Sequence, residues 1–247
     1  MAIETKPLTG AACWSCGAQR EERAHFCSAC GKVQPGVAAD HFSFFGLPRK
    51  LALDAAALQR EFYRLSRKLH PDLYARATEE ERRWSLEKSS QLNDAYRALK
   101  DPVARTEHLL ALEGVQLEEQ SKAATDRARA TGEEKKQVVP PELLEEVFEF
   151  NMQLEELRLA RKMGEDDSGV VEELATHREN FGQMLKDLGD ELRSCWKQWD
   201  ALPFHEHADT AGDGAERRRV RDKMVDLLNR RSYIRNLVRD VNQALGN

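Results

Sequence analysis

The sequence contains few residues that interrupt helices. Its 14 Gly and 8 Pro make up about 9% of the 247 residues, against an average usage of about 12%. Charged residues, in contrast, reach 33%. This combination favours amphipathic helices over a β-sheet protein. No run of the sequence approaches the roughly 18 uncharged apolar residues of a membrane-spanning helix, so we expect neither an integral membrane protein nor a membrane partner.

Several targeting and catalytic signatures are also missing. The first ten residues lack the basic start and apolar stretch of a secretory signal, and they contain no Arg, which argues against a mitochondrial leader. We therefore expect a cytoplasmic protein. The sequence has no Gly-rich phosphate loop, no Ser/His/Asp order and no metal motif with an open position, so we expect no catalytic residues and no enzymatic activity. The net charge of −5 gives no overall attraction for nucleic acid.

Cysteine is scarce, yet four of the five cysteines fall within the first thirty residues. Cys13, Cys16, Cys27 and Cys30 form two C-x-x-C-G knuckles that are ten residues apart. Two such pairs complete a tetrahedral thiolate shell, which predicts a structural zinc site without an open coordination position. The alternatives are two disulfides or free thiols, and disulfides are disfavoured in a reducing compartment. His25 is an alternative ligand beside the second knuckle.

The remaining sequence divides by its helical periodicity and punctuation. Residues 1–36 form the Cys/Gly-rich module, and residues 40–112 form a compact helical region. Residues 113–139 are polar and charged, which indicates a flexible or transiently helical linker. Residues 140–247 hold three long helical patterns, typical of an up-down-up bundle. The sequence therefore predicts a mainly α protein: a helical hairpin region and a C-terminal three-helix bundle, preceded by a small zinc-knuckle module.

The middle region has clear helix boundaries. Asp54 is a suitable N-cap for a first helix, which must end near His70 because Pro71 disfavours a helical conformation in the residue before it. Thr78 begins a capping box, so a second helix starts there. Two helices joined by a short loop pack antiparallel. The tripeptide His70-Pro71-Asp72 is therefore expected at the tip of a helical hairpin.

A cationic row lies on the outer face of the first of these helices. It consists of Arg60, Arg64, Arg67 and Lys68, about 200° around the helix from the apolar stripe. An exposed row of charge is by default a solvated face, and a lone His-Pro-Asp tripeptide is by default an ordinary capped turn. A basic face that ends in an exposed loop carboxylate is a more specific arrangement than either of these.

A resemblance to J-domains is carried by the segment Asp40-His41-Phe42-Ser43-Phe44-Phe45-Gly46-Leu47-Pro48, by His70-Pro71-Asp72 and by the run Asn93-Asp94-Ala95-Tyr96-Arg97-Ala98-Leu99-Lys100-Asp101-Pro102. More narrowly, the sequence resembles the HscB-type co-chaperones of iron–sulfur cluster assembly. The resemblance is strong over 40–112 and looser over 140–247. The cysteine knuckles resemble the N-terminal tetracysteine module of eukaryotic-like members.

The resemblance implies a docking function for the hairpin. A J-domain docks on the ATPase domain of a heat-shock-70-class chaperone (HscA/DnaK type), at its junction with the interdomain linker, and stimulates ATP hydrolysis there. The residues that this implies for chaperone binding are Arg60, Arg64, Arg67, Lys68, His70, Pro71 and Asp72. The basic row would meet an acidic surface, and Asp72 would form a charge-assisted bond with an arginine of the chaperone.

The helix that begins near Pro141 carries two apolar rows. One row suits a bundle core and consists of Leu143, Val147, Phe150, Leu154 and Leu157. The second row lies about 100° away, and a wide core face is an open alternative for it. The resemblance implies instead that this row and its acidic edge bind the iron–sulfur scaffold protein IscU. The matching residues are Leu144, Phe148, Glu149, Met152 and Glu156.

These expectations combine into one functional hypothesis. The chain would deliver the IscU scaffold to a specialised heat-shock-70-class chaperone and stimulate that chaperone's ATPase, as a monomer or weak homodimer. One alternative is a J-domain co-chaperone with a different client on the C-terminal bundle. A second is a zinc-ribbon adaptor that binds nucleic acid, although the acidic balance of the chain argues against a nucleic-acid partner.

Overall fold

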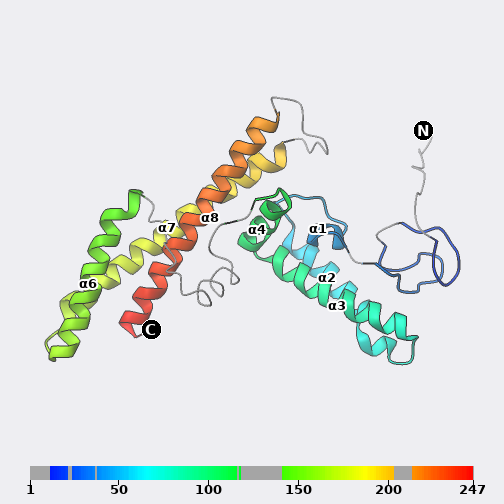
Figure 1. The fold of residues 1–247 in the computed structure, drawn as a ribbon, viewed down its shortest axis with the longest axis horizontal. Coiled ribbons are helices and arrows are strands. Elements are labelled where there is room, and N and C mark those ends of the chain that lie inside the picture. The colour runs from blue at the N-terminus through cyan, green and yellow to red at the C-terminus, as the bar shows by residue number, and fades with distance from the viewer. Residues whose placement is uncertain are drawn as a thin grey trace. The chain divides into compact units, whose positions relative to one another are not determined.

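The computed structural model describes residues 12–21, 24–36, 38–115, 117, 141–202 and 213–246, without the side chains of Glu142 and Asp213. The regular secondary structure of the described part is helical apart from two isolated β-bridges (Figure 1). The prediction of a mainly α protein is therefore confirmed. Most of the expected linker, 113–139, lies outside the described residues. Among the described helices, none has both the length and the apolar character that crossing a bilayer requires.

The chain divides into two compact units, Met1–Leu109 and Leu110–Asn247. The first unit contains the cysteine knuckles and most of residues 40–112, whose sequence resembles a J-domain. Its helical elements are α1 (His41–Phe44), α2 (Ala55–Leu69), the 3₁₀ turn η1 (Pro71–Tyr74), α3 (Glu79–Lys100) and α4 (Pro102–Leu112), of which α4 crosses into the second unit.

The helix starts in this unit follow from side-chain caps. The Asp54 carboxylate accepts hydrogen bonds from two backbone N–H groups of α2, and Thr78 forms the expected capping box with Glu81. Asp101 accepts from the backbone N–H of Ala104 at the start of α4. Each cap satisfies donors that the first helical turn leaves unpaired, so the predicted boundaries are confirmed.

The core of the hairpin forms where α2 and α3 lie side by side (Figure 1). The apolar stripe of α2 and the inner face of α3 are buried together with α1. The most buried members are Leu58, Leu65, Leu69, Leu92, Ala95, Leu99 and Phe42. Phe62 also stacks on Tyr96 with ring centroids 4.1 Å apart. Each fully buried Leu stabilises the hairpin by about 1.5–3 kcal/mol, before the cost of ordering the chain.

The cysteine module, described over 12–21 and 24–36, consists of two knuckles with the same local fold. In each knuckle the first Cys donates its backbone N–H to the carbonyl five residues on: Cys13 to Ala18 and Cys27 to Lys32, both at 2.9 Å. Gly17 and Gly31 have φ values of 72° and 74°, a left-handed conformation that favours glycine. The trailing glycines therefore allow the tight turns that the C-x-x-C-G pattern predicts.

The second unit consists of the 3₁₀ turn η2 (Pro141–Leu143) and the helices α6 (Leu144–Met163), α7 (Ser168–Ala201) and α8 (Asp213–Leu245). Helix α6 packs against α7, where Phe150 meets Phe181 edge to face at 5.6 Å. Helices α7 and α8 pair along their lengths through a continuous apolar seam. The buried members of that seam include Leu174, Leu188, Leu192, Trp199, Val220, Met224, Ile234 and Val241.

Candidate functional site

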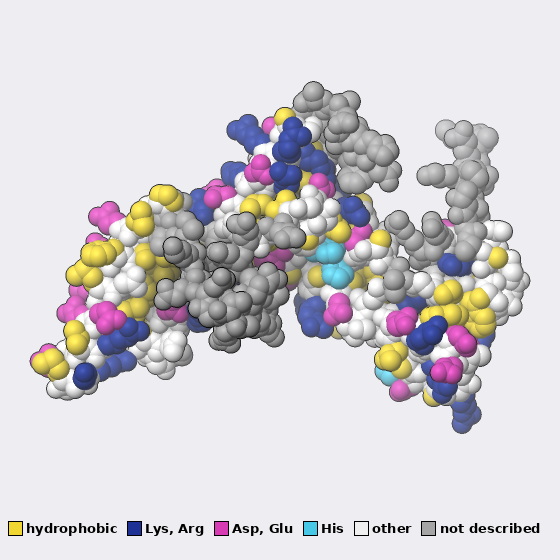
Figure 2. Space-filling model, in the orientation of Figure 1, with side chains coloured by type: hydrophobic (Ala, Val, Ile, Leu, Met, Phe, Trp, Pro, Cys, Tyr) yellow, Lys and Arg dark blue, Asp and Glu magenta, His cyan; other side chains and the backbone are white. Residues whose placement is uncertain are grey.

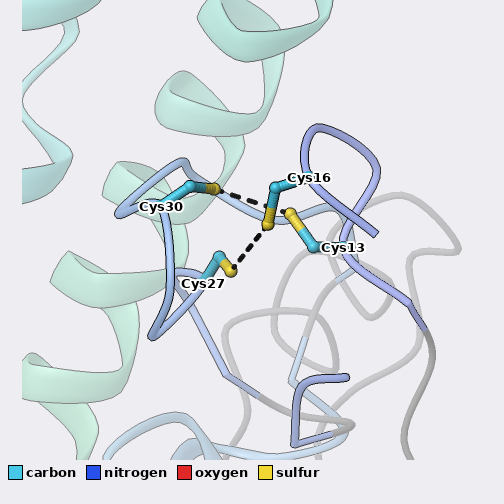
Figure 3. A group of neighbouring side chains, drawn as sticks. All are labelled: Cys13, Cys16, Cys27 and Cys30. Atoms are coloured by element: carbon cyan, nitrogen blue, oxygen red, sulfur yellow. Dashed lines mark hydrogen bonds between the residues drawn. The ribbon is translucent and has the colours of Figure 1, made fainter. Parts of the chain in front are cut away.

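The four knuckle cysteines converge on one point (Figure 3). Their sulfur atoms all lie within 4.8 Å of one another, and the Cys13–Cys30 and Cys16–Cys27 pairs are each 3.7 Å apart. A tetrahedral shell with metal–sulfur bonds of about 2.3 Å places its sulfurs about 3.8 Å apart. All four cysteines are free thiols, so the disulfide alternative is wrong. The group therefore fits a metal ion.

The surroundings of Cys13 favour the thiolate form that binds metals. Burial alone would raise the pKa of this thiol. Hydrogen bonds from the backbone N–H groups of Cys16 and Ser15, and from the thiols of Cys27 and Cys16, together outweigh burial and lower the pKa of Cys13 to about 6. The amide of Gln34 also donates to the Cys13 sulfur at 3.4 Å. These donors hold the first ligand of the site in place.

His25 is not part of the cluster. Its Nε2 atom lies 2.8 Å from the backbone oxygen of Phe44, and its ring centroid lies 4.4 Å from that of Phe44. Burial lowers the pKa of His25, so the ring is neutral at pH 7. The alternative that His25 ligates the metal is therefore wrong, and the side chain instead joins the cysteine module to α1.

Contacts to α3 fasten the cysteine module to the helical hairpin. The Nζ atom of Lys32 lies 2.8 Å from Oε1 of Glu81, whose side chain is 3% exposed. Trp14 meets Trp84 edge to face with ring centroids 5.5 Å apart. Sequence reasoning missed these residues, because a lone Lys and a lone Glu separated by 49 positions carry no pattern.

The His-Pro-Asp tripeptide lies at the tip of the hairpin, as predicted. Residue Pro71 ends α2, which leaves the carbonyl oxygen of Leu69 without a helical partner. The hydroxyls of Ser85 and Ser89 on α3 donate to this oxygen at 2.7 and 2.8 Å. These two hydrogen bonds from α3 fix the position of the turn. The side chain of Asp72 in the turn is 88% exposed.

His70 orders the turn from within. Its Nδ1 atom accepts a hydrogen bond from the backbone N–H of Asp72 at 3.3 Å. With Nδ1 as the acceptor, Nε2 of the neutral ring carries the proton. The tip therefore presents an N–H donor and a carboxylate side by side on an exposed surface.

The predicted basic row lies on the exposed face of α2 and reaches this tip. Arg60, Arg64, Arg67 and Lys68 are all exposed. Arg64 is held by Glu61 through bonds of 2.7 and 2.5 Å. The structure therefore brings all seven predicted chaperone-binding residues together. Leu73 of η1, which sequence reasoning missed, directly follows the tripeptide and is 67% exposed beside these residues.

The second apolar row of α6 is exposed, so the alternative of a wide core face is wrong. Leu144, Phe148 and Met152 are 56%, 66% and 59% exposed. Glu149 and Glu156 are also exposed beside them. Figure 2 shows hydrophobic and acidic side chains gathered over α6, at the left of the view. This acidic-apolar face of α6 contains all five residues predicted for scaffold binding.

Two further residues extend this face. Leu159 and Met163 are 56% and 69% exposed and fall on the same side of α6 as Phe148. At 100° per residue they lie about 20° and 60° around the helix from Phe148. Sequence reasoning missed them, although helical spacing alone relates them to the row.

Comparisons with known proteins confirm the resemblance, although no family model matches the chain. The "Co-chaperone protein HscB homolog" of Bordetella petrii is 44% identical over 92 residues, 37% of this chain and 54% of that protein. The human "Iron-sulfur cluster co-chaperone protein HscB" is 32% identical over 163 residues, 64% of this chain and 63% of that protein. An Arabidopsis thaliana homologue is 29% identical over 175 residues, 70% of this chain and 62% of that protein.

The fold agrees with these relatives. The crystal structure of human HscB superposes with a TM-score of 0.61 at 22% identity, covering 94% of this chain and 97% of that one. The helical hairpin with an exposed His-Pro-Asp turn is the arrangement that the resemblance to J-domains predicts. In sequence the chain is similar to the HscB co-chaperones, and in fold it is similar to the human member of that family. The matches span about half to under two thirds of the length of the first curated relatives.

Proposed function

We propose that this chain is a co-chaperone of iron–sulfur cluster assembly. It stimulates the ATPase of a heat-shock-70-class chaperone and delivers an IscU-type scaffold protein to it, as a monomer or weak homodimer. It has no active site of its own. Residues 40–112 act as the J-domain, and 140–247 bind the scaffold. The relatives named as iron–sulfur cluster co-chaperones support this proposal, because their matches of 163 and 175 residues are longer than either part alone.

One observation carries the proposal. The chain presents two exposed surfaces of different chemistry, each on its own compact unit. The first is the basic face of α2 with the tip at Asp72, which suits an acidic partner with an arginine. The second is the acidic-apolar face of α6 around Phe148, which suits a partner with an apolar patch. Two separate docking surfaces are what an adaptor between two proteins requires.

We propose zinc as the ion of the cysteine cluster, with a structural role. A shell of four thiolates is the structural zinc arrangement, and it leaves no coordination position for a substrate. The module is small, so the binding free energy of the metal is its folding free energy. Free thiols in such a site fit a reducing compartment such as the cytoplasm.

The test is a single-turnover ATPase assay of the cognate chaperone, with this chain and the scaffold added separately and together. We expect stimulation by the chain alone and a larger, synergistic stimulation when the scaffold is present. Stimulation without synergy, together with no binding of the scaffold, would favour a J-domain co-chaperone with a different client. Absence of stimulation, with a salt-dependent shift of DNA or RNA, would favour the nucleic-acid adaptor.

A further inference from the structure

A groove runs between the cysteine module and the hairpin, inside the first unit. It has a volume of about 650 Å³. One wall comes from the second knuckle and includes Phe26, Ser28 and Gly31. The other wall comes from the end of α2 and from η1. The first knuckle contributes no lining residue, so the two halves of an otherwise repeated module differ in their surroundings.

The hairpin wall consists of residues beside the His-Pro-Asp tip. Arg64 and Lys68 are exposed cations of α2 that line the groove. Leu73, which directly follows Asp72, lines it as well. Leu73 is 67% exposed, although an apolar side chain of this size gains free energy from burial. The groove is therefore continuous with the surface proposed for chaperone docking.

The two walls are joined by a contact across the groove. The Nζ atom of Lys68 lies 5.7 Å from the centroid of the Phe26 ring, within cation–π range. Arg64 is partly neutralised by its ion pair with Glu61, whereas Lys68 makes the ring contact and has no salt bridge within 4 Å among the described residues. Inside the groove, a cation and an exposed apolar side chain thus stand together.

We propose that this groove binds a segment of the heat-shock-70-class chaperone, and that the second knuckle is therefore part of the chaperone-docking surface. This inference rests on the proposed function. The chaperone segment would place a carboxylate against Lys68 and an apolar side chain against Leu73 and Phe26, which line the groove. Charge complementarity and continuity with the tip at Asp72 both favour this occupant.

The two knuckles provide matched variants. Ser28 and Ser15 are both exposed, and both lie between the two cysteines of a C-x-x-C motif. Only Ser28 lines the groove. In the full-length chain, Ser28→Glu should weaken binding to the ATP-bound chaperone about tenfold, because it repels the incoming carboxylate. Ser28→Lys should bind at least as tightly as the unmodified chain, and Ser15→Glu should leave the dissociation constant unchanged.

Binding is measured by surface plasmon resonance at low and high salt, with the zinc content of each variant measured by mass spectrometry. The difference between Ser28→Glu and Ser28→Lys should shrink at high salt. Equal binding by these two variants, with zinc retained, would overturn the inference. If Asp72→Asn still abolishes binding in that case, the proposed function stands. If the unmodified chain fails to bind the chaperone at all, the proposed function falls and this inference with it.

A measurement without substitutions covers the case in which a charged residue at position 28 displaces the metal. Hydrogen–deuterium exchange of the unmodified chain should slow in residues 24–33 when the ATP-bound chaperone is added. Exchange in residues 13–19, which hold the first knuckle, should stay the same. Absence of protection in residues 24–33, while the helix that carries Arg64 is protected, would contradict binding of the chaperone in this groove.

Discussion

The Nζ atom of Lys32 lies 2.8 Å from Oε1 of Glu81 and joins the cysteine module to the first turn of α3. The Glu81 carboxylate also accepts a hydrogen bond from the backbone N–H of Thr78 in the capping box of that helix. The hydrogen bond from Lys32 outweighs the effect of burial and lowers the pKa of Glu81. One ion pair therefore connects the cysteine module to the start of α3.

We predict that Lys32→Met destabilises the first unit by about 1 kcal/mol or more, because it leaves the Glu81 carboxylate buried without its ionic partner. Chemical denaturation of Lys32→Met, Glu81→Gln and the double variant gives the coupling of the pair. Lys50→Met, a change of an exposed lysine elsewhere, is the control. Additive effects of the two single substitutions would show that the pair contributes nothing.

The same pair predicts a dependence of stability on pH. Since the pKa of Glu81 is lowered on folding, its contribution is fully present above the pKa of an unfolded Glu, about 4.5. It is lost as the pH falls through the lower folded pKa. The free energy of unfolding of the unmodified chain should therefore drop more steeply below pH 4.5 than that of Glu81→Gln.

Lys88 predicts a second dependence of stability on pH, in the alkaline range. Its Nζ atom donates to the backbone oxygen of Gly36 at 2.6 Å, and burial, with a smaller effect of Arg20, lowers the pKa of Lys88 to about 8. Between pH 8 and the ordinary value of 10.5, the unfolded chain holds a proton that the folded chain has lost. Raising the pH over this range therefore favours folding.

The expected rise in the free energy of unfolding is of the order of 1–3 kcal/mol between pH 8 and pH 10.5. Lys88→Met should lack this rise, and the difference between the two pH profiles isolates Lys88 from other titrating groups. Identical profiles would show that the Lys88 amine keeps its ordinary pKa. A direct check is the titration of the Lys88 amine by NMR.

Asp72→Asn should reduce stimulation of the chaperone ATPase at least about tenfold, because the amide cannot form the charge-assisted bond. The side chain is 88% exposed, so the fold and the metal content should not change. Asp94→Asn is a matched control, since Asp94 is an exposed aspartate on the same unit that pairs with Arg97. Full single-turnover stimulation by Asp72→Asn would refute the assignment of the tip.

Phe148→Asp should weaken scaffold binding about ten- to a hundredfold, since the docked Phe side chain is worth about 1.5–3 kcal/mol. Phe148 is 66% exposed in the free chain, so the variant should fold normally. Leu86→Asp, a change of a 63% exposed residue on α3, is the control. Isothermal titration calorimetry with the scaffold measures both variants. Equal affinities would place the client surface elsewhere.

Cys13→Ser should remove the metal and lower the thermal stability of the first unit, because metal binding supplies the folding free energy of the module. Cys195→Ser is the matched control: Cys195 is a buried free thiol on α7 and lies outside the cluster. The readouts are metal content and the melting temperature of the full-length chain. Retention of one bound metal ion by Cys13→Ser would contradict the four-thiolate shell.

The sequence by itself determined the features that depend on neighbouring residues. Local hydrogen bonds set the helix starts at Asp54 and Thr78, and a backbone clash sets the helix end before Pro71, so their positions are readable from residue order. The four cysteines are equally readable, because two C-x-x-C turns hold their ligands at short range. Helical periodicity also separated the two apolar rows of α6.

Only the tertiary structure decided what covers each surface. Periodicity places Phe148 on a second face but does not say whether another helix packs there, and burial shows that none of the described helices does. The same holds for His25, which ligand spacing made a candidate and which instead contacts Phe44. The groove between Phe26 and Lys68 arises from residues 42 positions apart in sequence, and such long-range packing leaves no mark on local pattern.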